Sequence, residues 1–321
     1  MLAKQILSGD RRALAKAITL AESTRTDHAE QAVALLETLM PHTGKSIRLG
    51  VSGAPGVGKS TFIESLGNYL TLQGHQVAVL AVDPTSAVSG GSILGDKTRM
   101  ETLSVNPNAF VRPSPAGKTL GGVTRRTREC LLLCEAAGYD VIIVETVGVG
   151  QSETAVSDMT DMFLLLLSPG GGDDLQGIKR GIMELADLVL VNKADGDQAN
   201  LARQTVADYR AALHFMQART PSWTPQVEAC SALNNTNIEA AWSVVKAFRH
   251  ALVASGELTT LRAQQARAWM WAETAEMLIA GLKNHSTIKS MVPGLEQQVL
   301  AGTLPAIVAA ERLIEHYKAA D

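Results

Sequence analysis

The stretch that decides the fold is GAPGVGKST, Gly53 to Thr61. It matches the pattern G-x-x-x-x-G-K-[ST], in which glycines let successive backbone N–H groups turn inward around phosphate oxygens. The residues before it, SIRLGVSG, have the pattern of a buried strand, and those after it, STFIESLGNYLTLQG, have a helical pattern. A helix amino terminus would add its positive dipole end to the loop. The sequence therefore predicts a phosphate-binding loop between a strand and a helix.

All nine residues of this stretch are candidate nucleotide contacts, namely Gly53, Ala54, Pro55, Gly56, Val57, Gly58, Lys59, Ser60 and Thr61. Lys59 is expected to reach the β- and γ-phosphates, and the Ser60 hydroxyl is expected to bind Mg²⁺. The alternative is an ordinary glycine-rich turn. The spacing, together with the flanking strand and helix patterns, argues against that alternative.

Outward from this loop, short apolar runs alternate with longer helical patterns. Strands are predicted at 47–52, 77–83, 108–112, 140–146, 162–168, 188–193 and 226–232. Near-continuous apolar strands that alternate with helices indicate an α/β fold with a mostly parallel sheet covered by helices on both faces. The predicted organisation is a helical extension at 1–42, this α/β domain at 43–255, and a helical arm at 256–321, with interruptions near Pro293 and Pro305.

Composition limits the class of protein. The chain has 321 residues, 46% of them hydrophobic, and a net charge of −3, so charge favours neither nucleic acid nor an anionic membrane as a partner. Its apolar runs are too short to span a bilayer, and its first residues lack the pattern of a secretory signal. Cys130, Cys134 and Cys230 form no CxxC pair or disulfide framework. A cytoplasmic protein is expected.

The segment VLVNKADG places Asn192, Lys193 and Asp195 at the end of an apolar strand. A carboxylate at Asp195 can accept hydrogen bonds from both N1–H and the 2-amino group of guanine, whereas adenine offers neither donor. A site built around such a bond discriminates between bases by roughly 10⁴ or more. The stem of Lys193 can pack against the face of the base. The pattern therefore predicts GTP as the nucleotide.

A second candidate guanine contact follows in CSAL, at Ser231, Ala232 and Leu233. The backbone N–H groups near Ser231 and Ala232 are expected to reach O6 of the base. This segment comes after the phosphate loop and the NKAD segment in the chain. The order of the three motifs argues against a chance match.

Three carboxylates are candidates for the metal and hydrolysis site. Asp83 ends the second predicted strand, Asp96 lies in GGSILGDKTRM, and Glu145 ends VIIVET. Carboxylates at strand ends beside a phosphate loop are positioned to hold Mg²⁺, directly or through water. For Asp96 a solvated loop carboxylate is the alternative.

The segment VGVGQSE is predicted to change conformation with the nucleotide. The Gly148 N–H could sense the γ-phosphate, so that the loop relaxes when phosphate leaves. Ras-type switches place a glutamine where this chain has Val149, and Gln151 lies further on. We therefore expect slow intrinsic hydrolysis that a partner accelerates. Asp96, Gln151 and Lys179 all stay open as the residue that orients the attacking water.

Together, GAPGVGKSTF, VDPTS, GGSILGDKTRM, VETVGVGQSE, GGGDDLQGIK and NKADGD resemble the MeaB/ArgK/MMAA group of P-loop GTPases. These are G-protein chaperones of adenosylcobalamin-dependent methylmalonyl-CoA mutase. The resemblance implies GTP or GDP and Mg²⁺ as cofactors, the mutase as partner, and homodimerisation through the C-terminal arm. It also implies that Asp83, Asp96 and Glu145 serve the Mg²⁺ and hydrolysis site, together with Lys59.

The resemblance also gives a role to SPGGGDDLQGIKRG, residues 168–181. In the family this loop is a third switch that senses the nucleotide and contacts the mutase, gating cofactor delivery. Three glycines at 170–172 permit large backbone changes, and Asp173, Asp174 and Lys179 supply contacts that one state makes and another loses. A glycine-rich loop with a solvated charged edge is the alternative.

Two other functions stay open. A nickel-insertion GTPase would need a Cys/His cluster, whereas Cys130 and Cys134 resemble core residues and the histidines have no ligand spacing. A kinase of transport proteins would need a substrate pocket with an activating base, and no motif demands one. In the arm, Trp269 and Trp271 are expected to pair across a dimer, although they could instead pack on their own chain.

Overall fold

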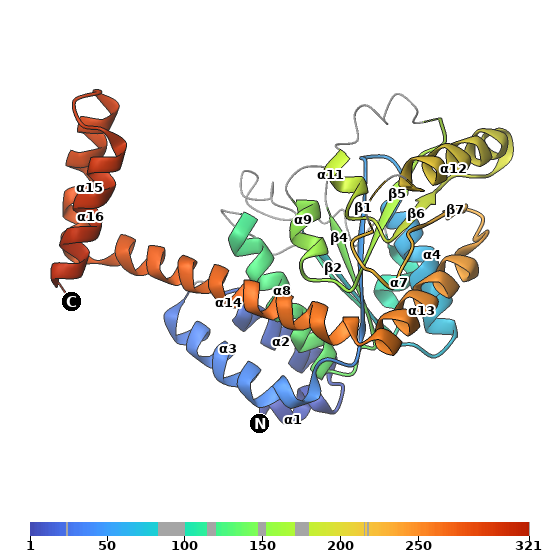
Figure 1. Ribbon diagram of the computed structural model, residues 1–321. Coiled ribbons are helices and arrows are strands. Elements are labelled where there is room, and N and C mark those ends of the chain that lie inside the picture. The colour runs from blue at the N-terminus through green and yellow to red at the C-terminus, as the bar shows by residue number, and fades with distance from the viewer. Residues whose placement is uncertain are drawn as a thin grey trace. The chain divides into compact units, whose positions relative to one another are not determined.

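A seven-stranded parallel sheet forms the centre of the first part of the chain (Figure 1). The computed structural model describes residues 1–23, 25–82, 100–113, 120–146, 152–170, 180–214, 216 and 218–320. The strand order is β3-β2-β4-β1-β5-β6-β7, and all neighbours run parallel. The strands are β1 Ile47–Gly53, β2 Val77–Val82, β3 Ala109–Arg112, β4 Val141–Thr146, β5 Met162–Leu167, β6 Leu188–Val191 and β7 Gln226–Ala229. The prediction of an α/β fold with a mostly parallel sheet is confirmed.

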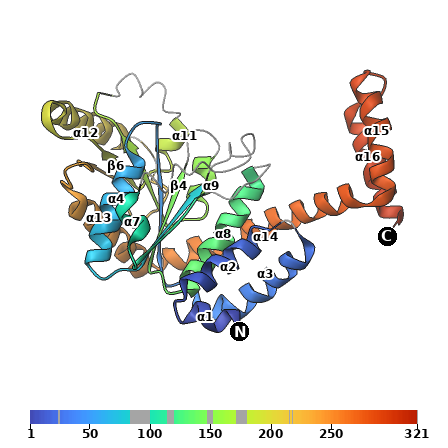
Figure 2. The same cartoon turned by 180° about the vertical axis from the view of Figure 1, so that it is seen from behind.

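Helices cover both faces of this sheet (Figures 1 and 2). In β5, Leu164 and Leu166 pack in one apolar cluster with α4 and α13, while Phe163 and Leu165 belong to clusters on the opposite face. This alternation follows from the two-residue period of a strand that is buried on both sides. The helical elements up to this point are α1 Leu2–Leu7, α2 Arg11–Ala21, α3 Thr26–Leu39, η1 Met40–His42, α4 Lys59–Leu72, α7 Glu101–Val105, α8 Leu120–Ala136, α9 Ser152–Ser157, α11 Arg180–Met183, η2 Gly196–Gln198, α12 Ala199–His214 and α13 Ile238–Ser255.

The N-terminal helices pack on α8 beside the sheet (Figure 2). Leu14 and Ile18 of α2 are fully buried in the cluster that also contains Leu131 and Cys134 of α8. Cys130, Cys134 and Cys230 are buried free thiols. The prediction that the two helical cysteines are core residues is therefore confirmed.

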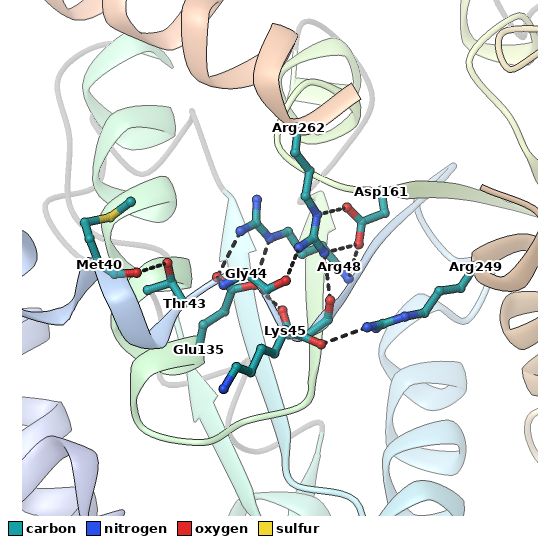
Figure 3. Close-up of polar contacts among 10 residues, drawn as sticks. Met40, Thr43, Gly44, Lys45, Arg48, Glu135, Asp161, Arg249 and Arg262 are labelled. Carbon is teal, nitrogen blue, oxygen red and sulfur yellow. Dashed lines mark hydrogen bonds and ion pairs between the residues drawn. The ribbon is translucent and has the colours of Figure 1, made fainter. Parts of the chain in front are cut away.

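A cluster of buried charges lies at the amino-terminal ends of β1 and β5 (Figure 3). Arg48 forms two hydrogen bonds of 2.9 Å with the carboxylate of Glu135 from α8. Arg262 forms hydrogen bonds of 2.8 and 2.7 Å with the two carboxylate oxygens of Asp161, and it also donates to the backbone oxygens of Gly44 and Ser46. We call Arg48, Glu135, Asp161 and Arg262 the basal charge cluster.

The chain divides into two compact units, Met1–Arg262 and Ala263–Asp321. The helices that form or enter the second unit are α14 Glu257–Asn284, α15 Ser286–Leu300 and α16 Ala306–Ala320. Leu295, Leu304 and Ala309 form its small core. The predicted division into extension, α/β domain and arm stays a prediction. None of the helices in the described residues combines the length and apolar character needed to cross a lipid bilayer.

The predicted interruption near Pro293 is wrong, because α15 continues through this residue. Proline removes one backbone donor from a helix, and that cost is offset where neighbouring turns are held by packing. Met291 and Val299 of α15 pack against the core that Leu295 forms with α16. The predicted break near Pro305 is confirmed, since α16 begins directly after it.

Candidate nucleotide-binding site

The phosphate-binding loop joins β1 to α4 and depends on its glycines. Gly53, Gly56 and Gly58 have φ values of +155°, +80° and +93°, a region that favours glycine. A Cβ on Gly53 would lie 2.5 Å from the carbonyl oxygen of Leu166, and one on Gly58 would lie 2.7 Å from Nδ2 of Asn192. The loop therefore packs so closely on β5 and on the NKAD segment that side chains are excluded at both positions.

Two polar side chains at the start of α4 contact the loop and β4. Lys59 is buried, and its Nζ donates hydrogen bonds to the carbonyl oxygens of Gly53, at 2.6 Å, and Ala54, at 3.3 Å. The hydroxyl of Ser60 donates to Oε1 of Glu145, at 3.3 Å. Glu145 is the second-to-last residue of β4 and is 6% exposed. The predicted metal-binding hydroxyl and one predicted carboxylate are thus adjacent.

These two oxygen groups suit a hard cation. Mg²⁺ prefers oxygen ligands and usually keeps several waters, so one hydroxyl and one carboxylate form a plausible part of its shell. Within the described ranges, no group of three His, Cys, Asp or Glu side chains lies close enough to hold a metal. Five predicted site residues lie outside the described residues, namely Asp83, Asp96, Gly148, Gln151 and Lys179.

Asn192 connects the phosphate loop with the CSAL segment. Its side chain is buried, and Nδ2 donates to the carbonyl oxygen of Val57, at 2.9 Å. Its Oδ1 accepts a hydrogen bond from the N–H of Ala232, at 3.0 Å, and another from the Cys230 thiol, at 3.7 Å. Burial raises the pKa of Cys230 to about 12, so the thiol stays protonated and can donate. Asn192 therefore fixes two loops relative to each other.

Lys193 and Asp195 are also held in place. Lys193 has a φ of +60°, and its Nζ donates to the carbonyl oxygen of Gly56, at 2.7 Å. Its side chain thus extends over the phosphate loop, as packing on a base would require. Oδ1 of Asp195 accepts a hydrogen bond of 2.5 Å from the Ser231 hydroxyl, which orients the carboxylate.

The two backbone donors predicted to reach guanine O6 have partners within the protein. The N–H of Ser231 donates to the carbonyl oxygen of Thr236, at 3.1 Å, and that of Ala232 donates to Asn192. Leu233, the last residue of the predicted contact, is 75% exposed. In the phosphate loop, Ala54, Pro55, Gly56 and Thr61 are exposed and Val57 is buried.

Sequence reasoning missed Ser65, in the middle of α4. This buried serine donates a hydrogen bond of 2.6 Å to the carbonyl oxygen of Ala232. The sequence offers one indication of its role. Ser65 comes three residues after Phe62 and one before Leu66, so its polar side chain lies on the apolar face of the helix.

The parallel sheet brings the phosphate loop, Glu145, the NKAD segment and the CSAL segment to one edge, at the carboxyl ends of β1, β4, β6 and β7. These features define a P-loop GTPase. The chain belongs to the MeaB family of methylmalonyl-CoA mutase-associated GTPases, whose family model matches residues 14–287.

Individual relatives agree with this assignment. The methylmalonic aciduria type A homolog of Mus musculus is 49% identical over 98% of this chain and 78% of its own length. GTPase ArgK of Escherichia coli is 50% identical over 86% of this chain and 83% of its own length. The crystal structure of a LAO/AO transport system kinase covers 99% of this chain and 96% of its own, with 38% identity and a TM-score of 0.77.

Proposed function

We propose that this GTPase is a chaperone of adenosylcobalamin-dependent methylmalonyl-CoA mutase and gates the loading, protection or reactivation of its cofactor. The observation that carries this proposal is the match of a mutase-associated GTPase family to a chain whose described residues place the phosphate loop, Glu145, the NKAD segment and the CSAL segment at one edge of the sheet. The similarity to the methylmalonic aciduria type A homolog of mouse supports the same proposal.

The described side chains support specific roles. Lys59 would leave its carbonyl partners for the β- and γ-phosphates, and Asp195, oriented by Ser231, would accept hydrogen bonds from the guanine N1–H and 2-amino group. Ser60 and Glu145 would hold Mg²⁺, which when bound supplies positive charge beside the phosphates. Asp83 and Asp96 complete this proposed metal and hydrolysis site, and Gly148 is the proposed γ-phosphate sensor.

The water that attacks the γ-phosphate needs a group to orient it. Asp96, Gln151 and Lys179 are the candidates. Since Val149 stands where Ras-type switches have glutamine, we expect the isolated protein to hydrolyse GTP slowly and a bound partner to accelerate the reaction.

We propose that the loop at 168–181 responds to the nucleotide and contacts the mutase. Its described beginning is anchored: Gly170 has a φ of +76°, and its N–H donates to the Thr205 hydroxyl of α12, at 3.2 Å. A Cβ on Gly170 would lie 2.7 Å from Leu201. A fixed starting point beside the GTPase core would convert a change at the nucleotide into a defined movement of the charged residues that follow.

The proposal is tested by measuring GTP hydrolysis with and without purified methylmalonyl-CoA mutase, beside an ATP control. We expect a slow basal rate with GTP, a many-fold increase with the mutase, and no turnover of ATP. Asp174→Ala, in the same loop but not a candidate for orienting the water, is the matched variant, in which the basal rate should persist while stimulation falls. If the mutase does not change the rate of GTP hydrolysis, the mutase is not the partner of this protein. The GTPase assignment would then stand without a known partner.

A kinase is the second candidate, because the relative of known structure is named as a LAO/AO transport system kinase. The same reactions distinguish the two functions when the terminal phosphate of GTP is labelled. The chaperone proposal expects all label in free phosphate. Label on a protein acceptor would favour the kinase instead.

A further inference from the structure

Ser65 connects the helix of the phosphate loop with the predicted guanine-reading segment. Its hydroxyl donates a hydrogen bond of 2.6 Å to the carbonyl oxygen of Ala232, and both residues are buried, at 9% and 3% exposure. The two residues lie 167 positions apart in the chain. A short hydrogen bond in the interior is electrostatically stronger than one in water, so it restrains the orientation of the carbonyl group.

The loop that contains Ala232 is closed on itself. Ser231 and Thr236 exchange backbone hydrogen bonds of 3.1 and 2.9 Å, and the N–H of Asn234 donates to the Ser231 hydroxyl, at 3.2 Å. Asn192 accepts from the N–H of Ala232. The peptide group before Ala232 is therefore held by Asn192, and the peptide group after it is held by Ser65.

The geometry of a trans peptide gives the second of these bonds a consequence. The Ala232–Leu233 bond is trans, since the described residues contain no cis peptide bond. In a trans peptide the C=O and N–H groups point in opposite directions. Because the Ala232 carbonyl points toward α4, the Leu233 N–H points away from α4, and Leu233 itself is 75% exposed.

We propose that Ser65 is a positioning residue for guanine recognition: it orients the Ala232–Leu233 peptide so that the Leu233 N–H donates to O6 of the base. The inference rests on the proposed guanine site. The Ala232 N–H is already donated to Asn192, and Ser65 fixes the next donor along the chain. Asp195 would read N1–H and the 2-amino group, which adjoin O6 on the same edge of the base, and its carboxylate is oriented by Ser231.

Because Ser65 and Asp195 are proposed to act on different atoms of the base, substituting each should change the affinity for different nucleotide analogues. Inosine diphosphate lacks the 2-amino group that Asp195 reads, whereas 6-thioguanosine diphosphate replaces O6 by sulfur, a weaker acceptor. A helix residue that only satisfied a buried carbonyl would alter the affinity for all these nucleotides equally. A residue that positions the O6 donor would alter only the preference for oxygen over sulfur.

The test measures the Kd values of the full chain for GDP, inosine diphosphate and 6-thioguanosine diphosphate by calorimetry. In Ser65→Ala we expect the preference for GDP over the 6-thio analogue to fall by about three- to tenfold, the effect of one hydrogen bond. The preference for GDP over inosine diphosphate should stay within about twofold of the wild type, since Asp195 is untouched. Ser65→Thr keeps the hydroxyl and should retain both preferences.

Two controls separate the possible failures. Thr71→Ala removes another buried hydroxyl of α4, which donates to the carbonyl oxygen of Asn68, at 3.0 Å, and should change neither preference. Asp195→Asn should abolish the preference for GDP over inosine diphosphate. If it does so while Ser65→Ala weakens GDP and its 6-thio analogue equally, the role of Ser65 is overturned and the guanine site stands. If Asp195→Asn leaves that preference intact, the guanine site itself is overturned, and the role of Ser65 with it.

Discussion

Asp187 is an acidic residue whose environment opposes its charge. It lies directly before β6 and is 1% exposed. Its Oδ2 accepts a hydrogen bond of 2.8 Å from the Phe163 N–H and lies 3.4 Å from the guanidinium of Arg219. Burial raises the pKa of Asp187 to about 6, although Arg219 and the Phe163 N–H act in the opposite direction.

Asp187 therefore makes stability depend on pH in a defined direction. Between the unfolded pKa, near 3.8, and the folded pKa, about 6, the folded protein holds a proton that the unfolded chain releases. The contribution of protonated Asp187 to the free energy of unfolding is present at low pH and is lost as pH rises through 6. Relative to Asp187→Asn, the free energy of unfolding of the wild type should fall on the order of 1–2 kcal/mol between about pH 5 and about pH 7.5.

Urea denaturation of both proteins at a series of pH values measures this difference. Asp158→Asn changes an exposed carboxylate and serves as the control, with a difference from the wild type that stays constant over the same range. A wild type that becomes more stable relative to Asp187→Asn as pH rises would show instead that Arg219 keeps the carboxylate ionised in the folded state.

Among the helices, α14 is fastened at its beginning by the basal charge cluster (Figure 3). Arg262 makes two hydrogen bonds with Asp161 and donates to the backbone of the segment before β1. The planar guanidinium satisfies four acceptors at once, which a lysine ammonium cannot reproduce. Arg262 therefore links the start of α14 to the chain directly before β1 and β5.

Arg262→Lys should loosen the beginning of α14 without unfolding the sheet. We expect faster amide hydrogen exchange in residues 257–262 and a loss of about 2 kcal/mol in the free energy of unfolding, because hydrogen bonds to a buried carboxylate are lost. Arg267→Lys makes the same chemical change at an exposed position of the same helix and should have little effect. Equal protection of 257–262 in both variants would contradict the role assigned to Arg262.

At the scale of the whole molecule, the second unit carries an apolar stripe on α14. Met270, Trp271, Met277 and Leu278 are each at least half exposed. At about 100° per residue these four positions lie on one side of the helix, whereas Ile279, which is 55% exposed, lies on the other side near Ala272. Large apolar groups gathered on one face are typical of surfaces that bind another protein. The resemblance to the family implies a homodimer, and we propose this stripe as its interface.

Trp271→Glu should therefore convert the proposed dimer into a monomer, because a carboxylate in an apolar interface would have to be desolvated. Light scattering of both proteins at the same concentration measures the change in mass. Ala272→Glu introduces the same charge on the other side of α14 and should leave the dimer intact. If the wild type is already monomeric, or if the Trp271→Glu variant remains dimeric, the stripe is not the dimer interface.

The fold could be predicted from the sequence because the residue patterns that indicate its strands and helices are local. The central strands are mostly apolar runs, and helical patterns lie between the strands, so that the parallel sheet follows from order along the chain. The prediction failed at Pro293, where packing with α16 outweighs the local effect of proline. A propensity rule considers one residue at a time and cannot include that packing.

The sequence by itself predicted the chemistry of the candidate site: the phosphate loop, Glu145 and Asp195 carry recognisable patterns because their proposed partners are the nucleotide and its metal ion. Only the tertiary structure decided what holds these groups. Ser65 forms a hydrogen bond with Ala232, which lies 167 positions away in the chain, and Arg262 forms one with Asp161, 101 positions away. Such partners leave no motif, because any residue that the fold brings within hydrogen-bonding distance can serve, and the distance exists only after the sheet has formed.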